Sequence, residues 1–432
     1  MNHWQQLYHQ KHTTVEEALS RIPDGAVIGH SFCAMEPKTL LGSLHTLQGK
    51  VGGLHVLRAL DTGMYPFALD AACRDTFTVD SMFFMGPDRA SHKLRMTSPI
   101  PTHLHNMTQR CYGYRRPNVA LISVTPMDSY GYLRCSLCLI GEKELVEQAD
   151  LVIAEVNPNL PYVHGETEFH ITQIDALVEA QTPIPQLPRS QISETDRIIG
   201  AHIASLVNDG DTIQLGIGSI PDAAAQALMG KHDLGVHTEM LTNSLVDLAE
   251  AGVITGRKKS LHPGKIIGTF ALGDQRLYDW MDDNPSVHLM RGCYVNDPFV
   301  VAQNDNMVSI NTCVSIDLTG QVNSESVGFL HYSGSGGQND TAFGANRARN
   351  GRSIIALHAT AKSGTVSTIT PVLAPGAVVT LSRNNVDYVV TEYGIAPMRG
   401  RPVRERVENL ISIANPDFRA ELRRGAEQYM LW

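Results

Sequence analysis

Two stretches of the chain, residues 14–44 and 193–228, share one pattern of hydrophobic and polar positions. Each opens with a helix-capping signal, Thr14 with Glu17 and Ser193 with Asp196, and continues with the spacing of an amphipathic helix. Each helix then stops at an Asp-Gly turn, and these two turns are 185 residues apart (209 − 24). A short apolar strand, a loop of small residues and a proline near the start of a new helix follow in both stretches.

Helix, strand, tight loop and helix, twice over, favour an internal duplication over chance similarity. They predict an α/β fold of two similar open α/β domains with largely parallel sheets. A proline-rich segment, "EAQTPIPQLPRSQ", indicates the linker, which divides the chain into an N-terminal domain, 1–185, and a C-terminal domain, 186–432. Apolar runs predict further strands at 119–124, 151–156, 353–357, 377–381 and 387–394.

The segment "LGVHTEM" predicts a buried strand that ends at Glu239. Glutamate is a poor strand former, and an interior carboxylate without partners is costly. Upstream, the loop Gly216–Gly218 leaves a strand and opens a helix, where backbone N–H groups and the helix dipole favour a phosphate or an oxyanion. Ligands of open α/β sheets bind outside the carboxyl ends of the strands, so Glu239 is placed to face this loop. From spacing alone, a glutamate that faces the loop and an ordinary glutamate that caps the following turn are equally favoured interpretations.

Several other residues compete for a role at this edge. Glu36, Glu325 and Glu392 also follow predicted strands or occupy loops. The string "HYSGSGGQND" is dense in glycine and could wrap a ligand, and Lys362 in "ATAKSGTVST" could meet a phosphate or a carboxylate. Each is equally compatible with an ordinary surface turn or a solvated charge.

Composition and charge narrow the class of protein. The 432 residues carry a net charge of −9 without a block of like charge, which argues against nucleic acid or an anionic membrane as the main partner. No apolar run is long enough to span a membrane, and the first residues have no secretory h-region. Seven scattered cysteines favour reduced thiols, so we expect a cytoplasmic location.

The sequence gives only weak support for a metal site or for a nicotinamide-binding site. The pair Cys135 and Cys138 lacks a second C-x-x-C, and the segment 164–170 lacks the H-E-x-x-H spacing of a zinc site, so no metal is expected. The loop Gly216–Gly218 carries Pro221 where a dinucleotide-binding G-x-G-x-x-G would place its third glycine. A nicotinamide-dependent dehydrogenase is therefore a distant alternative.

Taken together, the chain resembles the acetyl-CoA hydrolase/CoA-transferase family, most closely its 4-hydroxybutyrate and butyrate:acetate CoA-transferase members. The resemblance rests on the segments "GIGSIPDA", "LGVHTEM", "DDNPSVHL", "YVNDP", "DLTGQVNSES", "SGSGGQND", "TLSRNNVDYVVTEYG" and "NPDFR". Segments of the first half, "VALISVTPMDSYGY" and "VNPNLPYVHGETEFHITQID", add to it, so it covers nearly the whole chain. It implies the class I CoA-transferase fold, which agrees with the duplication.

The resemblance also implies roles for particular residues. Glu239 corresponds to the catalytic nucleophile, and it is favoured over Glu325, whose "SESVG" only superficially resembles the "SENG" string of other CoA-transferases. Coenzyme A is implied as the carried group of an acyl-CoA substrate, moved through a glutamyl-CoA thioester by ping-pong kinetics. The residues implied to line its site are Gln214, Leu215, Gly216, Ile217, Gly218, Val314, Gly336, Gly337 and Lys362.

The implied activity is transfer of CoA between an acyl-CoA and a short-chain carboxylic acid, of the 4-hydroxybutyrate or butyrate and acetate type. An acyl-CoA hydrolase with the same nucleophile is the enzymatic alternative, and a catalytically silent CoA-binding protein is the alternative from another class. The resemblance further implies a homo-oligomer. The identity of the acyl group stays open at this point, because one methylene changes binding by only about 1–3 kcal/mol.

Overall fold

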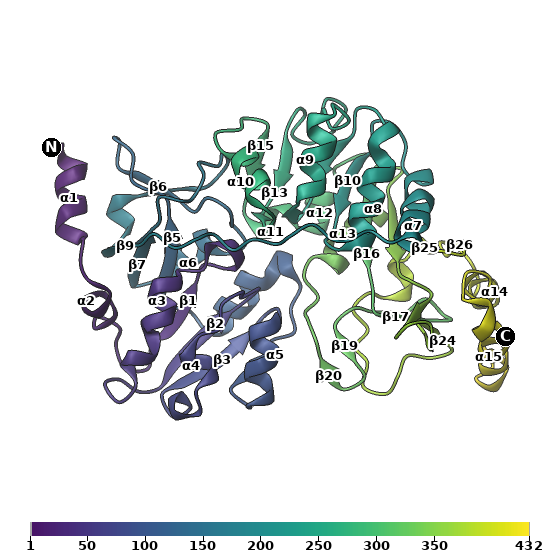
Figure 1. The fold of residues 1–432 in the computed structure, drawn as a ribbon, viewed down its shortest axis with the longest axis horizontal. Coiled ribbons are helices and arrows are strands. Elements are labelled where there is room, and N and C mark those ends of the chain that lie inside the picture. The colour runs from purple at the N-terminus through teal and green to yellow at the C-terminus, as the bar shows by residue number, and fades with distance from the viewer. Residues whose placement is uncertain (1, 432) are drawn as a thin grey trace. The chain divides into compact units, whose positions relative to one another are not determined.

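The computed structural model describes residues 2–431, which divide into two compact units (Figure 1). Of the described residues, the first comprises 2–187 and 268–294, and the second comprises 188–267 and 295–431. The segment 268–294 follows part of the second unit in sequence but belongs to the first in space. A single cut in the chain therefore cannot describe the two units.

The first unit is built on a parallel sheet of seven strands in the order β4-β3-β2-β1-β5-β7-β9. Strand β5 is buried along its whole length, as expected for a strand covered on both faces. The strand order reverses between β1 and β5, which marks the topological switch point. The strands are β1 (Val27–His30), β2 (Leu54–Arg58), β3 (Phe77–Ser81), β4 (Thr97–Pro99), β5 (Val119–Val124), β7 (Leu151–Val156) and β9 (Ala176–Glu179).

The second unit repeats this arrangement. Its strands follow the order β13-β11-β10-β16-β21-β25-β26, parallel except for the last pair, and the order reverses between β10 and β16. Strand β10 thus holds the place of β1, and β11 holds the place of β2. The strands are β10 (Thr212–Leu215), β11 (Gly235–His237), β13 (Ile266–Gly268), β16 (Met307–Thr312), β21 (Arg352–Ala356), β25 (Tyr388–Thr391) and β26 (Gly394–Pro397).

The helices confirm the paired pattern in the sequence. Thr14 caps α2 and Ser193 caps α7, each through its side-chain oxygen. In the second unit α8 packs between α7 and α9, beside the sheet (Figure 1). The helices of the first unit are α1 (His3–Lys11), α2 (Val15–Leu19), α3 (Lys38–Ser43), α4 (Pro66–Leu69), α5 (Gly86–Lys93), α6 (Glu142–Gln148) and α10 (Gln275–Met281). Those of the second unit are α7 (Glu194–Ser205), α8 (Ser219–Ala227), α9 (Asn243–Glu250), α12 (Pro298–Val301), α13 (Gln338–Arg347), α14 (Val403–Ser412) and α15 (Pro416–Gln428), while α11 (Gly292–Val295) crosses the boundary.

One strand expected from the sequence is wrong. The apolar run 377–381 forms no strand; Leu381 makes only an isolated bridge to Val322. Val378 and Val379 remain exposed, because a turn closed by the Ala377 N–H and the Ala374 carbonyl carries this run over the surface. The run packs beside the hairpin of β19 (Ser326–Val327) and β20 (Leu330–His331), since the Val378 N–H donates to the Ser326 hydroxyl at 3.0 Å.

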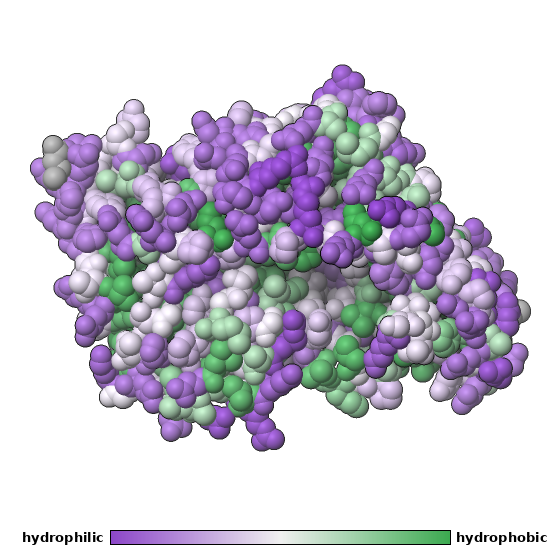
Figure 2. All heavy atoms as spheres, in the orientation of Figure 1, coloured by the Kyte–Doolittle hydropathy of each residue, from purple (hydrophilic) through white to green (hydrophobic). Residues whose placement is uncertain are grey.

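Hydrophilic side chains cover most of the face drawn in Figure 2, and hydrophobic ones gather over the hairpin β19–β20. The exposed apolar residues of this hairpin are Val327, Phe329 and Leu330. Within residues 2–431, no helix is both long and apolar enough to cross a membrane.

Candidate active site

Glu239 lies two residues beyond the end of β11, which runs between β10 and β13 at the centre of the second unit. His237 and Thr238 before it and Met240 after it are buried, whereas Glu239 keeps part of its accessible surface. The next strand, β12 (Met240–Leu241), begins immediately afterwards. The strand therefore ends at His237, two residues before its predicted end at Glu239, and the carboxylate follows it at the carboxyl edge of the sheet.

Two donors from distant parts of the chain hold this carboxylate. The side-chain amide of Asn296 donates to Oε2 of Glu239 at 3.0 Å, and the backbone N–H of Gly337 also donates to the carboxylate. A Cβ atom at residue 337 would lie 2.0 Å from Oε2 of Glu239 and 2.1 Å from Nδ2 of Asn296. Only glycine at this position lets the backbone approach the carboxylate.

The charge environment of Glu239 disfavours ionisation. Desolvation and, to a smaller extent, the nearby carboxylate of Asp340 together raise the pKa of Glu239 to about 7, against the two hydrogen bonds that lower it. None of these neighbours is a cation. An acid with a pKa near the working pH and no neutralising partner is a typical active-site group.

The loop Gly216–Gly218 follows β10 directly and leads into α8. Gly218 is the N-cap of α8 with φ of 112°, a conformation that other residues rarely adopt. Close contact of α7 with α8 fixes the helix behind the loop, since a Cβ atom at Gly200 would lie 2.7 Å from the backbone of Ala223. Thr238 places its hydroxyl 3.3 Å from the carbonyl oxygen of Leu215, so the ends of β10 and β11 are joined beside the loop.

The residues that the sequence suggests for coenzyme A fall into three groups. Gln214 and Leu215 are buried in the sheet, and Gln214 accepts hydrogen bonds from the Ser309 hydroxyl and the Ile310 N–H of β16. Gly337 is the N-cap of α13 and donates to Glu239, and Gly336 directly precedes it. The exposed members are Ile217, Val314 and Lys362, and Lys362 occupies the turn between β22 (Thr360–Ala361) and β23 (Val366–Ser367).

Two of the competing glutamates, Glu36 and Glu392, have side-chain hydrogen-bond partners of their own. Glu392 accepts a hydrogen bond from the N–H of Ala359 at 2.9 Å. Glu325 is buried beside the hairpin β19–β20, and its carbonyl accepts from the N–H groups of Tyr332 and Ser333. Glu36 belongs to the first unit and takes part in a separate cluster.

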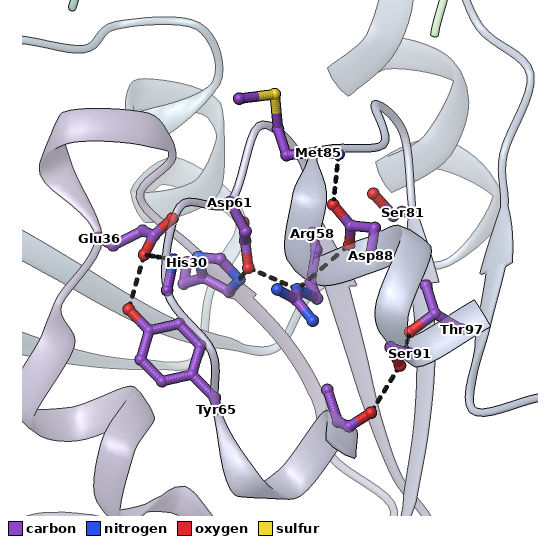
Figure 3. A network of polar contacts seen from close by, with 12 residues as sticks. His30, Glu36, Arg58, Asp61, Tyr65, Ser81, Met85, Asp88, Ser91 and Thr97 are labelled. Atoms are coloured by element: carbon purple, nitrogen blue, oxygen red, sulfur yellow. Dashed lines mark hydrogen bonds and ion pairs between the residues drawn. The ribbon is translucent and has the colours of Figure 1, made fainter. Parts of the chain in front are cut away.

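This cluster, defined as His30, Glu36, Arg58, Asp61 and Asp88, is almost wholly buried at the carboxyl ends of β1 and β2 (Figure 3). Arg58 forms an ion pair with Asp61 and approaches Asp88 at 3.7 Å. Glu36 accepts from the hydroxyl of Tyr65 at 2.6 Å and from the N–H of Gly63 at 3.0 Å. Burial and the neighbouring Asp61 raise the pKa of Glu36 to about 8.

The sequence alone indicated no role for most of the residues around Glu239 and in the first-unit cluster. Asn296, Asp340, Arg58, Asp61 and Asp88 carried no assigned role. Asn296 lies in "YVNDP", but nothing in that string places it against a residue 57 positions earlier (296 − 239). A charged residue at the end of a short apolar run, such as Arg58 in "LHVLR", was the one available signal for the first-unit cluster.

The segment 164–170 shows how sequence proximity can mislead. His164 lies 3.0 Å from Asp283, whereas His170 caps a 3-10 turn through Thr172. Over residues 2–431 no group of three or more histidine, cysteine or acidic side chains could hold a metal ion. Cys135 and Cys138 are both buried free thiols.

Two similar open α/β units, one of which presents a carboxylate held by Asn296 and Gly337 at the carboxyl edge of its sheet, define the fold and the candidate site. Sequence comparison shows the family. Residues 1–188 match the acetyl-CoA hydrolase/transferase N-terminal domain, and residues 273–426 match the corresponding C-terminal domain. The chain therefore belongs to the acetyl-CoA hydrolase/transferase family and is an enzyme of CoA-thioester chemistry.

Similar proteins cover the chain from end to end. The 4-hydroxybutyrate coenzyme A transferase of Clostridium kluyveri is 41% identical over 97% of this chain and 98% of its own length. The butyryl-CoA:acetate CoA-transferase of Anaerostipes caccae is 34% identical over 98% of each. The crystal structure of RipA from Yersinia pestis superposes over 100% of both chains with a TM-score of 0.95 at 35% identity.

Proposed function

We propose that the protein is a CoA-transferase that moves CoA between an acyl-CoA and a short-chain carboxylic acid, with Glu239 as the nucleophile. The observation that carries this proposal is the Glu239 carboxylate itself: partly exposed, held by two neutral donors and not neutralised by a cation. The acids named for its relatives, 4-hydroxybutyrate, butyrate and acetate, are the proposed substrate class.

In the proposed first step, Oε1 of Glu239 attacks the thioester carbonyl, because Asn296 holds the other oxygen, Oε2. The C–S bond breaks, which gives a mixed anhydride between the acyl group and Glu239, together with CoA thiolate. The thiolate then attacks the Glu239 carbonyl, releases the carboxylic acid as its anion and leaves a glutamyl-CoA thioester. An incoming carboxylate reverses these steps, so the thioester energy is conserved without ATP.

The donors around Oε2 suit this sequence of steps. When the thiolate or an acid attacks the Glu239 carbonyl, negative charge develops on Oε2, which Asn296 already contacts, and the Gly337 N–H donates to the same carboxylate. Each such donor is worth about 3–4 kcal/mol in a transition state. The raised pKa also keeps the free carboxylate basic, which makes it a stronger nucleophile once it is ionised.

The CoA moiety is proposed to lie along the carboxyl edge of the second unit, residues 188–267 and 295–431. The proposed contacts are the residues assigned from the sequence: Gln214, Leu215, Gly216, Ile217, Gly218, Val314, Gly336, Gly337 and Lys362. For Gln214 and Leu215 the buried side chains leave the backbone as the contacting group. We also propose that the protein is a cytoplasmic homo-oligomer without a bound metal. Light scattering tests the oligomeric state, and elemental analysis tests for metal.

Intact-mass spectrometry with butyryl-CoA and no acceptor acid tests the chemistry. The expected result is a covalent gain of one CoA moiety on the peptide that bears Glu239, lost when acetate is added. Steady thiol release from an unmodified protein would instead identify a hydrolase. An unmodified protein without turnover over a panel of acyl-CoAs would leave the CoA-binding alternative.

A further inference from the structure

We infer that His237 is a positioning residue that fixes Asn296 against Glu239 by donating a hydrogen bond to the carbonyl of Val295. This inference rests on the proposed role of Glu239 as nucleophile. It assigns a function to the histidine of the "HTEM" segment, whose ring bonds to the Val295 carbonyl.

The hydrogen bond between His237 and Val295 is short and buried. Nε2 of His237 lies 2.8 Å from the carbonyl oxygen of Val295, and both residues are buried. A carbonyl only accepts, so Nε2 must carry the proton and the imidazole must be the Nε2–H tautomer. Among residues 2–431, Nδ1 of His237 has no hydrogen-bond partner, so this single bond orients the ring.

The next residue after Val295 is Asn296, whose amide donates to Oε2 of Glu239. His237 and Glu239 are two residues apart on one segment. The hydrogen bonds and the intervening covalent bonds therefore form a closed ring through His237, Val295, Asn296 and Glu239. In such a ring the strand that carries the nucleophile also sets the position of the donor that holds it.

The surroundings keep this histidine neutral. Burial lowers the pKa of His237 to about 3, and the nearby Lys259 and His262 act in the same direction. Lys259 runs across Gly235 of the same strand and donates from Nζ to the carbonyls of Val236 and Lys265, at 2.7 Å each. The strand end is thereby held on the side of β13 by Lys259 and on the side of Asn296 by His237.

Asn296 has little other support. Its side chain is fully buried, and within residues 2–431 its Oδ1 has no hydrogen-bond partner. The amide orientation is therefore set by Glu239 and by the backbone at residue 295. Loss of the His237 bond is expected to let the amide swing away from Oε2 rather than to unfold the unit.

The test compares His237→Gln with His237→Asn. The glutamine amide nitrogen reaches the position of Nε2 and can donate to Val295, whereas the asparagine amide is too short. We expect His237→Asn to lower kcat by about 10²-fold with less than about threefold change in the KM for acyl-CoA, and His237→Gln to stay within about fivefold of the wild type. Equal losses in the two variants would overturn the inference.

A double-mutant cycle with Asn296→Ala separates positioning from a general structural role. If His237 acts through Asn296, adding His237→Asn to Asn296→Ala costs little further activity. Multiplying losses would contradict the assignment. The acid limb of the pH profile supplies a second readout: it should rise in His237→Asn, because a hydrogen bond that lowers the pKa of Glu239 is loosened.

Imidazole 15N NMR tests the same point without relying on the folding of a variant that loses the bond. The His237 resonance, identified by its absence in His237→Gln, should report the neutral Nε2–H tautomer from pH 5 to 8. The opposite tautomer, or a titration within that range, would refute the inference. Wild-type protein that forms no adduct with butyryl-CoA would count against the proposed function, whereas adduct formation with equally active His237 variants would count only against this inference.

Discussion

The two units place acidic groups at matching points of their sheets and use them in opposite ways. Asp61 follows the end of β2 by three residues, and Glu239 follows the end of the matching strand β11 by two. Asp61 is paired with a buried arginine, whereas Glu239 is held by an amide and a backbone N–H beside a second acid. A carboxylate paired with arginine is stabilised as a structural anion, while one without a cation keeps a raised pKa and stays reactive.

The largest expected effect is a loss of activity on substitution of Glu239, without a loss of stability. Glu239→Gln keeps the shape of the side chain but removes the nucleophile, so transferase activity should fall by at least about 10⁴-fold. Thermal unfolding should occur at an equal or higher temperature, because a strongly desolvated carboxylate without a cation is removed. Activity within tenfold of the wild type would exclude Glu239 as the nucleophile. The adduct assay on the same variant checks this independently.

In the first unit the same kind of change should act on stability instead. Arg58→Met leaves the buried acids of the cluster without their cation and is expected to cost about 3–5 kcal/mol of unfolding free energy. Urea denaturation measures this cost. The matched control is Arg116→Met, which breaks an exposed pair with Asp150 and should cost less than about 1 kcal/mol. Equal costs in the two variants would show that the cluster does not stabilise the unit.

A smaller effect tests the close approach of the backbone to Glu239. Gly337→Ala places a methyl group where the Glu239 and Asn296 side chains lie, so these must move, and kcat should fall by about 10²-fold. Gly230→Ala is the control, because a Cβ atom there meets nothing within 4 Å. Steady-state kinetics with butyryl-CoA and acetate compare the two. Unchanged kcat in Gly337→Ala would remove Gly337 from the site.

The smallest effect concerns pH. Because only ionised Glu239 attacks, kcat/KM should rise with pH through about 7, the pKa of Glu239 in the free enzyme. Asp340→Asn removes a like charge, so the pKa of Glu239 should fall and the acid limb should move down by about one unit. A pH–rate profile from pH 5 to 9 measures both. A limb that moves upward, or does not move, would contradict the arrangement of these two acids.

Activity is expected to rise with pH, whereas the contributions of Glu239 and Glu36 to the stability of the fold should fall with pH. The folded pKa values of Glu239, about 7, and Glu36, about 8, lie above the ordinary glutamate value of 4.5. Their contribution to stability is complete below pH 4.5 and is lost as the pH rises through the folded values. Between pH 5 and 8 these two groups should therefore lower the free energy of unfolding, and Glu239→Gln should remove the share of this fall that Glu239 contributes, which is complete by about pH 7.

The sequence by itself determined the repeated units, because periodicity, capping residues and Asp-Gly turns are local signals. It also determined where Glu239 and the loop Gly216–Gly218 lie, since both follow strands of one strand–helix–strand unit. Local signals failed at 377–381, where an apolar run does not become a strand because no neighbouring strand pairs with it beyond the bridge at Leu381.

Only the tertiary structure decided which groups meet Glu239. Asn296 and Gly337 come from segments 57 and 98 residues further along the chain (296 − 239 and 337 − 239), brought to the carboxyl edge by helices α12 and α13. The same holds for the approach of Asp88 to Arg58 and for the placement of residues 268–294 in the first unit. Hydrogen-bond partners and desolvation depend on which distant segments pack together, and no local pattern along the chain encodes that.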